Sequence, residues 1–429
     1  MVDKKILLIC YYLKKNMYSF NALAGAIETR KELNELRILF PRNKEDLILA
    51  ISNAIGQYEK VIVGISFTSN QLWDIQDTIL ELREKFGDKP LICAGGPHPT
   101  GDPKGTLKMG FDVCVIGEGE IIFPEILIKI KENSEFRDTA GIAYLDEDGN
   151  YFKNKPSAKI DLNDYPPFSI KYNKLGPIEI TRGCPFLCYF CQTPFIFGTK
   201  SRHRSIASII KYIEISMEYG FKDIRFISPN GFLYGSQDNT VKLSIIEDLL
   251  SQIRNIIEPK NRIFFGTFPS EVRPENVSED ILNIILKFAN NDNLIIGAQS
   301  GSQKVLDNCN RGHTVDDIYN AVNYTINAGL KANVDFIFGL PNERKEDVQD
   351  TLNVIDDLIQ LGARIHAHTF IPLPGTPFQY KKPTPLSKNL RNRINQLVEQ
   401  ELIYGHWRQQ NKFGKRIMKY FAKSNVDEI

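Results

Sequence analysis

The sequence lacks the features that mark secreted and membrane-bound proteins. No apolar run approaches the roughly 20 residues that a membrane-spanning helix needs. The first apolar stretch, in MVDKKILLICYYLKK, ends at Lys14 and Lys15, which favours a first β-strand over a secretory leader. We therefore expect a cytoplasmic protein without a membrane span.

The chain also has almost no net charge. Its 53 lysines and arginines balance 52 acidic residues, which leaves a formal charge of +1. The bulk charge therefore does not point to nucleic acid or to an anionic membrane, and no clear nucleic-acid site stands out. A length of 429 residues with 42% hydrophobic side chains predicts two or three domains with sizeable cores.

Cysteine is scarce, with seven residues in the whole chain. This number is too low for the disulfide scaffold of a small secreted domain. Three of the cysteines lie in apolar, strand-like runs, where buried small hydrophobes are expected, and a fourth is isolated in LDNCNRG. These four are Cys10, Cys93, Cys114 and Cys309.

The first 125 or so residues alternate short apolar runs with amphipathic stretches such as NQLWDIQDTILELREKFG, whose apolar residues recur at helical intervals. Strands that alternate with helices predict a Rossmann-like, doubly wound parallel sheet. The expected strands are 5–10, 36–40, 60–66, 90–96 and 112–117.

Several of these expected strands end in glycine-rich turns. Ligands of doubly wound sheets bind at the carboxyl ends of the strands, and glycine allows a ligand to approach the backbone closely. Ordinary strand-to-helix turns have the same composition. His98, in GGPHP, lies in one such turn, where a structural role is more common than a ligating one. The candidate ligand edge consists of Ser66, Thr68, Gly95, Gly96, Gly117 and Glu118.

A hairpin and a linker separate the two halves of the chain. Residues 140–156 alternate polar and apolar residues around a D-G turn, and residues 159–177 are rich in proline and aperiodic. We expect domain boundaries at 1–140, 141–175, 176–380 and 381–429. The last segment reads as one long helical pattern followed by a basic end.

The second half repeats a strand–helix unit six times, which predicts a partial (β/α)6 TIM-type barrel followed by C-terminal helices. The chemistry of such barrels lies on the loops that follow the strands. The expected strands are 177–183, 223–229, 262–268, 293–301, 332–341 and 364–374.

Three further cysteines, Cys184, Cys188 and Cys191, follow the first strand of this series in TRGCPFLCYFCQTP. Three thiolates can hold three irons of a 4Fe-4S cube and leave the fourth iron open. Structural zinc is the alternative, but it prefers four protein ligands, and the nearest histidine, His203, lies in a separate basic stretch. The spacing favours the iron–sulfur interpretation.

The C-x3-C-x2-C motif after the first of six barrel strands resembles that of the radical S-adenosylmethionine (SAM) superfamily. The resemblance extends to FISPNGF, GAQSGSQKVLDNCNRGHT, VDFIFGLPNE and FIPLPGTPF. It implies a 4Fe-4S cluster on the three cysteines and a SAM pocket, in which Pro229 would belong to the second-strand motif. The residues it assigns to SAM are Phe190, Ser228, Asn230, Gln299, Ser300 and Arg311.

The same resemblance implies the reaction. In this family, one electron from the reduced cluster cleaves SAM and releases a 5′-deoxyadenosyl radical, which abstracts hydrogen from a substrate held by the barrel. An electron donor such as ferredoxin or flavodoxin is then required. The substrate, whether a small molecule, a lipid or a macromolecule, cannot be read from the sequence.

The first half resembles the cobalamin-binding-type domain that precedes many radical SAM barrels. The residues that carry this likeness are VIVGISFTSN, LICAGGPHPT, DVCVIGEGE and the DYPPF linker. The Asp-x-His-x-x-Gly motif whose histidine ligates cobalt is missing. We expect this domain to bind cobalamin as a cofactor. The alternative is a degenerate domain that only covers the barrel or helps to hold substrate.

The resemblance predicts a radical SAM enzyme that could methylate an unactivated carbon with cobalamin. Other hypotheses are a cobalamin-free radical enzyme, a tRNA methylthiotransferase and an iron–sulfur redox sensor that is not an enzyme. Four polar residues keep open roles. His366 and His368 share one face of a strand, inward or outward, while Glu271 and Arg273 either bind substrate or, as we expect, cap a helix.

Overall fold

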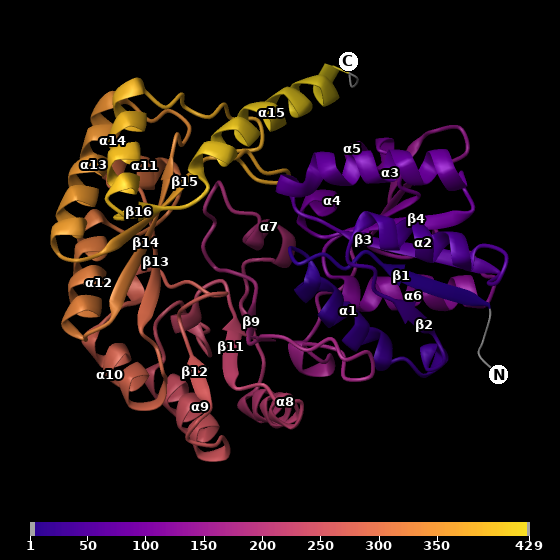
Figure 1. Cartoon of the computed structure of the whole chain (residues 1–429), viewed down its shortest axis with the longest axis horizontal. Helices are drawn as coiled ribbons and strands as arrows, with labels where there is room; N and C mark the ends of the chain where they lie inside the picture. Colours follow the sequence, from indigo (N-terminus) through magenta and orange to yellow (C-terminus); the bar gives the residue numbers. More distant parts are fainter. Residues whose placement is uncertain (1–4, 427–429) are drawn as a thin grey trace. The chain divides into compact units, whose positions relative to one another are not determined.

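The computed structural model describes residues 5–426, with side chains up to residue 422. The chain divides into two compact units (Figure 1). The first runs to Gly176 and includes Leu373–Gly375, and the second comprises Pro177–Pro372 and the residues from Thr376 onward. The four domain boundaries predicted from the sequence stay a proposal.

The first unit is built on one seven-stranded sheet with the order β2-β1-β3-β4-β5-β6-β7. The first five strands are parallel, which confirms the predicted Rossmann-like sheet, and the last two form an antiparallel hairpin. The strands are β1 (Ile6–Cys10), β2 (Arg37–Leu39), β3 (Lys60–Ser66), β4 (Pro90–Gly95), β5 (Val113–Val115), β6 (Ile142–Leu145) and β7 (Tyr151–Lys153).

Helices cover this sheet because its central strands are buried on both faces. Every residue of β1 is buried. Its Ile6, Leu8 and Cys10 share a core with α1 and α6, as expected for the alternating side chains of a strand. The helices are α1 (Met17–Glu28), η1 (Lys31–Leu33), α2 (Lys44–Ala54), η2 (Ser69–Gln71), α3 (Leu72–Phe86), α4 (Pro97–Gly101), α5 (Pro103–Lys108), α6 (Gly119–Lys131) and η3 (Leu162–Asp164).

The second unit contains the six predicted barrel strands in two parallel sheets, β12-β11-β8 and β13-β14-β15-β16. An isolated parallel bridge between Val272 and Ile296 joins the segment after β12 to β13. Within the described residues no ladder joins β8 to β15, so the barrel is partial. The strands are β8 (Ile178–Glu179), β9 (Thr181–Arg182), β10 (Arg202–His203), β11 (Asp223–Ile227), β12 (Arg262–Phe264), β13 (Asn293–Gln299), β14 (Lys331–Phe338), β15 (Arg364–Thr369) and β16 (Ile403–Tyr404).

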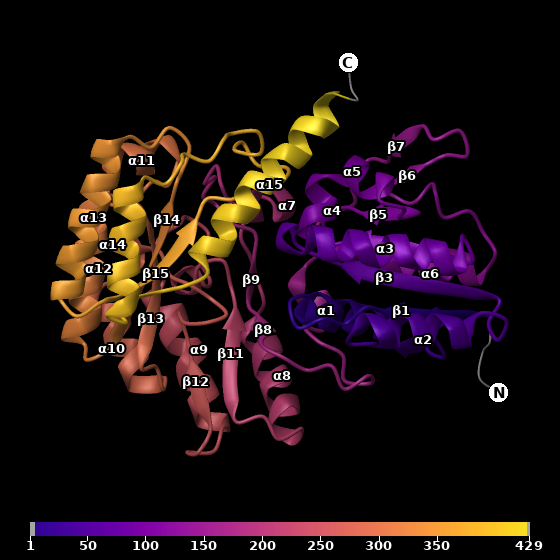
Figure 2. The same cartoon turned by 45° about the horizontal axis from the view of Figure 1, so that its top comes forward.

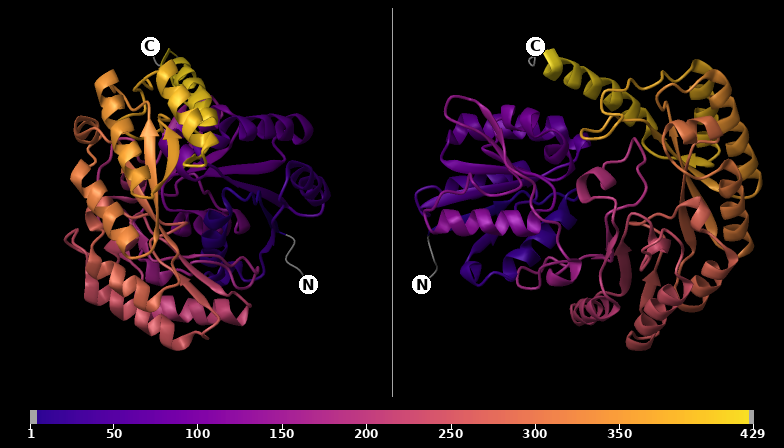
Figure 3. Two further views of the ribbon diagram at one scale, coloured as in Figure 1. Left: turned by 60° about the vertical axis from the view of Figure 1, so that its left-hand side comes forward. Right: turned by 180° about the vertical axis from the view of Figure 1, so that it is seen from behind.

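The helices of this unit line the outer side of its strands, as Figure 2 and the rear view in Figure 3 show for α12, α13 and α14. The helices are α7 (Thr193–Phe197), α8 (Ile206–Glu218), η4 (Gly231–Leu233), α9 (Leu243–Ile256), η5 (Pro274–Asn276), α10 (Glu279–Phe288), α11 (Gln303–Asn308), α12 (Val315–Asn327), α13 (Lys345–Gln360), α14 (Lys388–Glu399) and α15 (Trp407–Val426).

The expectation of one long helical pattern after residue 384 is wrong. Two helices, α14 and α15, are separated by β16, which pairs in parallel with β15. The helical backbone is broken by positive φ angles of 60° at Glu401 and 123° at Gly405. Apolar periodicity cannot detect such a break, because Ile403 is buried in the strand as it would be in a helix.

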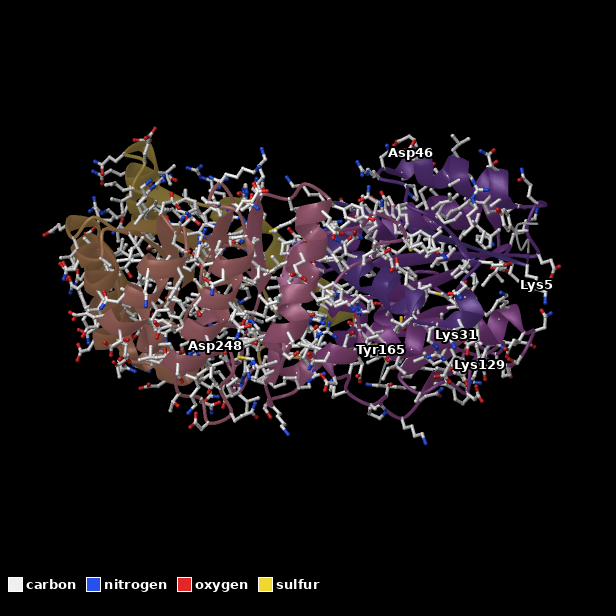
Figure 4. The ribbon with its side chains drawn as sticks, turned by 90° about the horizontal axis from the view of Figure 1, so that it is seen from below. Lys5, Lys31, Asp46, Lys129, Tyr165 and Asp248 are labelled. Atoms are coloured by element: carbon white, nitrogen blue, oxygen red, sulfur yellow. The ribbon has the colours of Figure 1, made fainter. Side chains whose placement is uncertain are left out.

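The surface carries charges of both signs. Figure 4 labels the exposed side chains of Lys5, Lys31 and Asp46 on the first unit and Asp248 on the second. None of the helices in the described part of the chain combines the length and apolar character of a membrane span.

Candidate functional site

The three-cysteine loop is held in place by backbone hydrogen bonds. It starts after β9, and the antiparallel pairing of Arg182 with Arg202 brings β10 back beside its start. The amide of Cys184 donates to the carbonyl of Gly198 (3.1 Å), and the amide of Cys191 donates to the carbonyl of Cys188 (3.0 Å). The loop conformation therefore does not depend on the thiols, which stay available as ligands.

The loop opens onto a cavity of about 450 Å³ within the second unit. Side chains from the ends of several strands line it, as the barrel architecture predicts. The lining residues are Cys184, Phe186, Cys188, Phe190, Cys191, Thr193, Ser228, Pro229, Phe268, Pro269, Ser270, Glu271, Arg273, Ile295, Gln299, Arg311, Asp335, His366 and His368.

The three thiols suit a soft, positively charged metal centre. All three are free of disulfides. Burial raises the pKa of Cys184 to about 11 and also raises that of Cys191, so the thiolates need a cation nearby. Arg273 and Arg311 each donate from Nη1 to the sulfur of Cys188, at 3.7 and 3.5 Å, so two guanidinium groups lie beside this sulfur.

The arrangement does not fit a closed zinc site with His203 as the fourth ligand. The Nδ1 atom of His203 lies 3.0 Å from Thr181 Oγ1, and its Nε2 lies 2.9 Å from the carbonyl oxygen of Ser236. Both ring nitrogens are therefore occupied, and His203 does not line the cavity. Three cysteines beside an open cavity fit a cluster with one exchangeable corner.

Four of the six residues assigned to SAM line this cavity: Phe190, Ser228, Gln299 and Arg311. Gln299 ends β13 at a positive φ of 72°, next to a register shift in the ladder. The Nε atom of Arg311 is buried and has no hydrogen-bond partner in the protein. A buried donor without a partner is costly, so Arg311 fits a role in holding a ligand.

The other two assigned residues do not line the cavity. Asn230 donates from Nδ2 to Asn276 Oδ1 (2.7 Å), while its own Oδ1 is buried and has no partner. Ser300 is fully buried and contacts Thr351 through its hydroxyl (3.2 Å). Ser300 therefore supports the end of β13 from behind.

The expectation that Glu271 and Arg273 cap a helix is wrong. Ser278 provides the N-cap of α10, and Arg273 makes no side-chain cap to η5. The guanidinium of Arg273 instead lies 3.5 Å over the ring of Phe186 and pairs with Glu275. Burial raises the pKa of Glu271, which also lines the cavity. Sequence spacing could not show that both residues face the cysteine loop.

His366 and His368 point inward and line the cavity together with Asp335. Their ligand atoms all lie within 4.8 Å of one another. Sequence reasoning had not selected Asp335. An acidic residue inside the apolar strand run VDFIFG was the available signal, because a carboxylate is rarely buried without a partner.

In the first unit, the predicted cobalamin edge gathers at the carboxyl ends of the parallel strands. Ser66 ends β3 and is the register partner of Gly95, the last residue of β4. The amide of Thr68 donates to Gln71 Oε1 (3.2 Å) in a capping box at the start of η2. Glu118, just before α6, accepts the amide of Ile160 (3.1 Å). These polar groups therefore also make hydrogen bonds that stabilise the first unit itself.

The glycines of this edge differ in what surrounds them. A Cβ added at Gly95 or Gly117 would meet nothing within 4 Å, which leaves room for a ligand. A Cβ at Gly96 would lie 2.7 Å from Ser66 Oγ, so this glycine is required by the protein's own turn. His98 is fully buried, lies 2.9 Å from Ser69 Oγ and stacks on Phe67, as a structural histidine should.

Residues 178–355 match the family profile of the radical SAM superfamily. The chain therefore contains a radical SAM domain. Residues 7–127 match a B12 binding domain, so this radical SAM protein carries a cobalamin-type domain before its barrel. Members of the superfamily are enzymes that use a 4Fe-4S cluster and SAM, in agreement with the cysteine cavity.

Curated relatives resemble this radical SAM protein over most of their length. An uncharacterized methyltransferase of Pyrococcus horikoshii is 26% identical over 348 residues, which cover 77% of this chain and 72% of the relative. A tRNA-2-methylthio-N(6)-dimethylallyladenosine synthase of a Sulfurihydrogenibium species is 24% identical, with coverage of 79% and 78%.

Two solved structures share the fold. TsrM from Kitasatospora setae, a radical SAM methyltransferase solved with cobalamin and a 4Fe-4S cluster, superposes with a TM-score of 0.69 at 18% identity, over 88% of this chain and 74% of TsrM. OxsB, a cobalamin-dependent SAM radical enzyme solved with aqua-cobalamin, gives 0.63 at 18% identity, over 82% and 52%. Both structures share the fold of this chain over more than four fifths of its length.

Proposed function

We propose that this radical SAM enzyme methylates an unactivated carbon of its substrate with the help of cobalamin. The observation that carries the proposal is the cavity of the second unit, where three free thiols face an open space. The B12-binding profile of the first unit and the methyltransferase names of relatives support the choice of reaction.

The chain's own residues take the following roles in this proposal. Cys184, Cys188 and Cys191 hold the cluster. Arg273 and Arg311 donate charge-assisted hydrogen bonds to the sulfur of Cys188. When bound, the cluster and SAM supply a radical that abstracts hydrogen, and cobalamin supplies a carrier for the methyl group.

Binding of SAM is assigned to residues at the ends of the barrel strands. Phe190, Ser228, Gln299 and Arg311 line the cavity, and Arg311 offers its unpartnered Nε. Asn230 offers an unpartnered, buried Oδ1 beside them in sequence. The ring of Phe186 and the pair Phe268-Pro269 add apolar walls to the cavity.

Cobalamin binding is assigned to the strand ends of the first unit. Gly95 and Gly117 leave open space beside the backbone, and Ser66, Thr68 and Glu118 supply polar groups near it. The chain has no Asp-x-His-x-x-Gly motif. We therefore expect the corrinoid to bind without a histidine from this domain on its cobalt.

A tRNA methylthiotransferase is the second candidate, because several curated relatives carry that name. Such enzymes resemble this chain but hold a further cluster on three cysteines of the first domain. Here Cys10 and Cys93 belong to the same core on one face of the sheet. The register partner of Cys93 is Val113, and Cys114 is the next residue of β5, so its side chain projects from the opposite face. Three cysteines on two faces cannot share one cluster.

The partners remain part of the proposal. The cluster needs an electron donor, for which a small ferredoxin or flavodoxin is suitable, and the substrate is not identified. A cytoplasmic location is also proposed, because a reducing compartment keeps the chain's thiols free.

The test is anaerobic reconstitution with iron, sulfide and cobalamin, followed by measurement of iron content, bound corrinoid and 5′-deoxyadenosine release. We expect about four irons per chain, corrinoid binding and SAM cleavage. Cys184→Ser, Cys188→Ser or Cys191→Ser should abolish the cluster and SAM cleavage. Cys309→Ser, a buried cysteine outside the cavity lining, is the matched control and should keep both.

Each alternative predicts a different result. Intact SAM cleavage without bound corrinoid would identify a cobalamin-free radical enzyme. A cluster that never cleaves SAM under reducing conditions would favour the redox sensor. Zinc on the three sulfurs, or a fourth side chain that closes the cube, would refute the proposal.

A further inference from the structure

The register of the second sheet places three potential metal ligands side by side. Asp335 on β14 is the direct register partner of His366 on β15. His368 follows two residues later and therefore projects from the same face of the strand. On the other side, Tyr404 of β16 is the partner of His366, and the two rings stack with centroids 4.6 Å apart. The sheet and the tyrosine together fix the orientation of His366.

Two of the three distances between the ligand atoms match those around a single metal ion. His366 Nδ1 lies 3.0 Å from Asp335 Oδ1 and 3.1 Å from His368 Nε2. Ligands that bind zinc or iron at about 2.0–2.2 Å are separated by about 3.0–3.4 Å when they occupy neighbouring positions. All three ligand atoms lie within 4.8 Å of one another. Two histidines and one carboxylate suit zinc or iron(II).

No arrangement of protons satisfies every hydrogen-bond contact among Asp335, His366 and His368. The side-chain oxygen Oε1 of Gln410 accepts a hydrogen bond from the amide of Thr369 (2.9 Å). The side-chain NH₂ group of Gln410 therefore faces Nδ1 of His368 (3.1 Å). A neutral His368 then carries its proton on Nε2, which points at Nδ1 of His366.

The same Nδ1 of His366 also faces the carboxylate of Asp335. An imidazole nitrogen holds either one proton or one lone pair in the ring plane, so it cannot accept from His368 and donate to Asp335 at once. A cation bound by all three groups removes this conflict.

The site faces the cavity that also holds the three cysteines. Three protein ligands leave coordination positions open toward that space, as in catalytic metal sites. Glu271 and Arg311 line the same cavity and partly balance each other's charge.

We propose that Asp335, His366 and His368 bind a divalent transition metal ion, which holds an oxygen- or nitrogen-bearing group of the substrate inside the radical SAM cavity. Metal binding itself is independent of the proposed methylation, whereas the role toward substrate rests on that function. The ion fixes the substrate's orientation relative to the cysteine loop, as radical chemistry in a shared cavity requires.

The test uses zinc alone as the probe on anaerobically reconstituted, full-length protein. One equivalent of zinc is added, excess metal is removed by a chelating resin, and the retained zinc is measured by mass spectrometry. Zinc-edge X-ray absorption then identifies its ligands. We expect about one zinc per chain with nitrogen and oxygen neighbours at about 2.0–2.1 Å.

Asp335→Asn and His368→Gln should lose the retained zinc, whereas His406→Gln, at an exposed histidine that is not one of the three ligands, should keep it. Iron content and circular dichroism of each variant show whether the fold and the cluster survive. Absence of zinc from the parent protein, sulfur neighbours at about 2.3 Å, or retention in both ligand variants would overturn the proposal.

Substitutions at Gln410 test the metal site without changing any of its three ligands. Zinc on Nε2 moves the His368 proton to Nδ1, which then needs an acceptor. Gln410→Glu supplies carboxylate oxygens for both this proton and the Thr369 amide, and should tighten zinc binding by about 10- to 100-fold. Gln410→Leu should weaken it. Equal zinc affinity in both variants would contradict a metal site.

Failure of this inference is separable from failure of the proposed function. Iron content and 5′-deoxyadenosine release report on the cysteine site, whereas zinc with nitrogen and oxygen ligands reports on Asp335 and the two histidines. A protein that binds zinc this way but lacks SAM cleavage refutes the function and supports the metal site. The reverse result refutes the metal site alone.

Discussion

Glu343 should make the stability of the second unit depend on pH in an unusual direction. It follows β14, is only 7% exposed and accepts the amide of Gly339 through Oε2 (2.9 Å). Burial, with a smaller contribution from Asp347, raises its pKa from 4.5 to about 7. The folded state therefore binds this proton more tightly than the unfolded state.

The sign follows from this difference. Below about pH 4.5 the carboxyl of Glu343 is protonated in both the folded and the unfolded state. Its burial then causes no ionisation-dependent loss in the free energy of unfolding. As the pH rises from about 4.5 to about 7, the unfolded chain ionises while the folded carboxyl keeps its proton, so the free energy of unfolding falls. At pH 8 the full penalty applies, and a shift of this size corresponds to roughly 3 kcal/mol.

Glu343→Gln removes the ionisation and keeps an oxygen for the Gly339 amide. We expect the variant to unfold at higher urea than the parent at pH 8, by up to about 3 kcal/mol, and to lose this advantage at pH 4.5. Urea unfolding of the reduced apoprotein at both pH values measures the effect. Glu218→Gln, an exposed position on α8, is the control. An advantage that is equal at both pH values, or absent at pH 8, would refute the reasoning.

Three further changes test other parts of the structure. Arg273→Gln removes a charged donor from Cys188 and should lower the midpoint potential of the reconstituted cluster by about 60–120 mV in an EPR titration, with Arg273→Lys shifting it less. Gly96→Ala forces a Cβ into occupied space at a φ of 92° and should cost about 1–3 kcal/mol of stability, whereas Gly56→Ala, at a φ of 86° in open space, should cost less. Phe336→Ala empties a fully buried position in β14 and should destabilise the second unit by about 3–5 kcal/mol in the same urea assay.

The sequence predicted those parts of the fold that depend on interactions between residues close together along the chain. Alternating apolar runs located the five parallel strands of the first unit and the six of the second, because burial on both faces demands nearly continuous apolar segments. The D-G turn located the hairpin β6–β7, and the cysteine spacing located the metal-binding loop. Each of these signals lies within a few residues of the element it specifies.

Long-range register decided the rest. Helical periodicity missed β16, because only its pairing with β15 distinguishes that strand from the end of a helix. The positions of Glu271 and Arg273 beside the cysteine loop depend on how several strand ends meet. No spacing in the sequence contains that information.

The sequence by itself determined the cluster loop, the two kinds of unit and therefore the radical SAM chemistry, since these depend on short motifs and on periodic burial. Only the tertiary structure brought Asp335 to His366 and His368. The two segments are 31 residues apart along the chain and become neighbours through the parallel register of β14 and β15. Metal ligands must converge within a few ångströms, and it is the sheet that makes them converge.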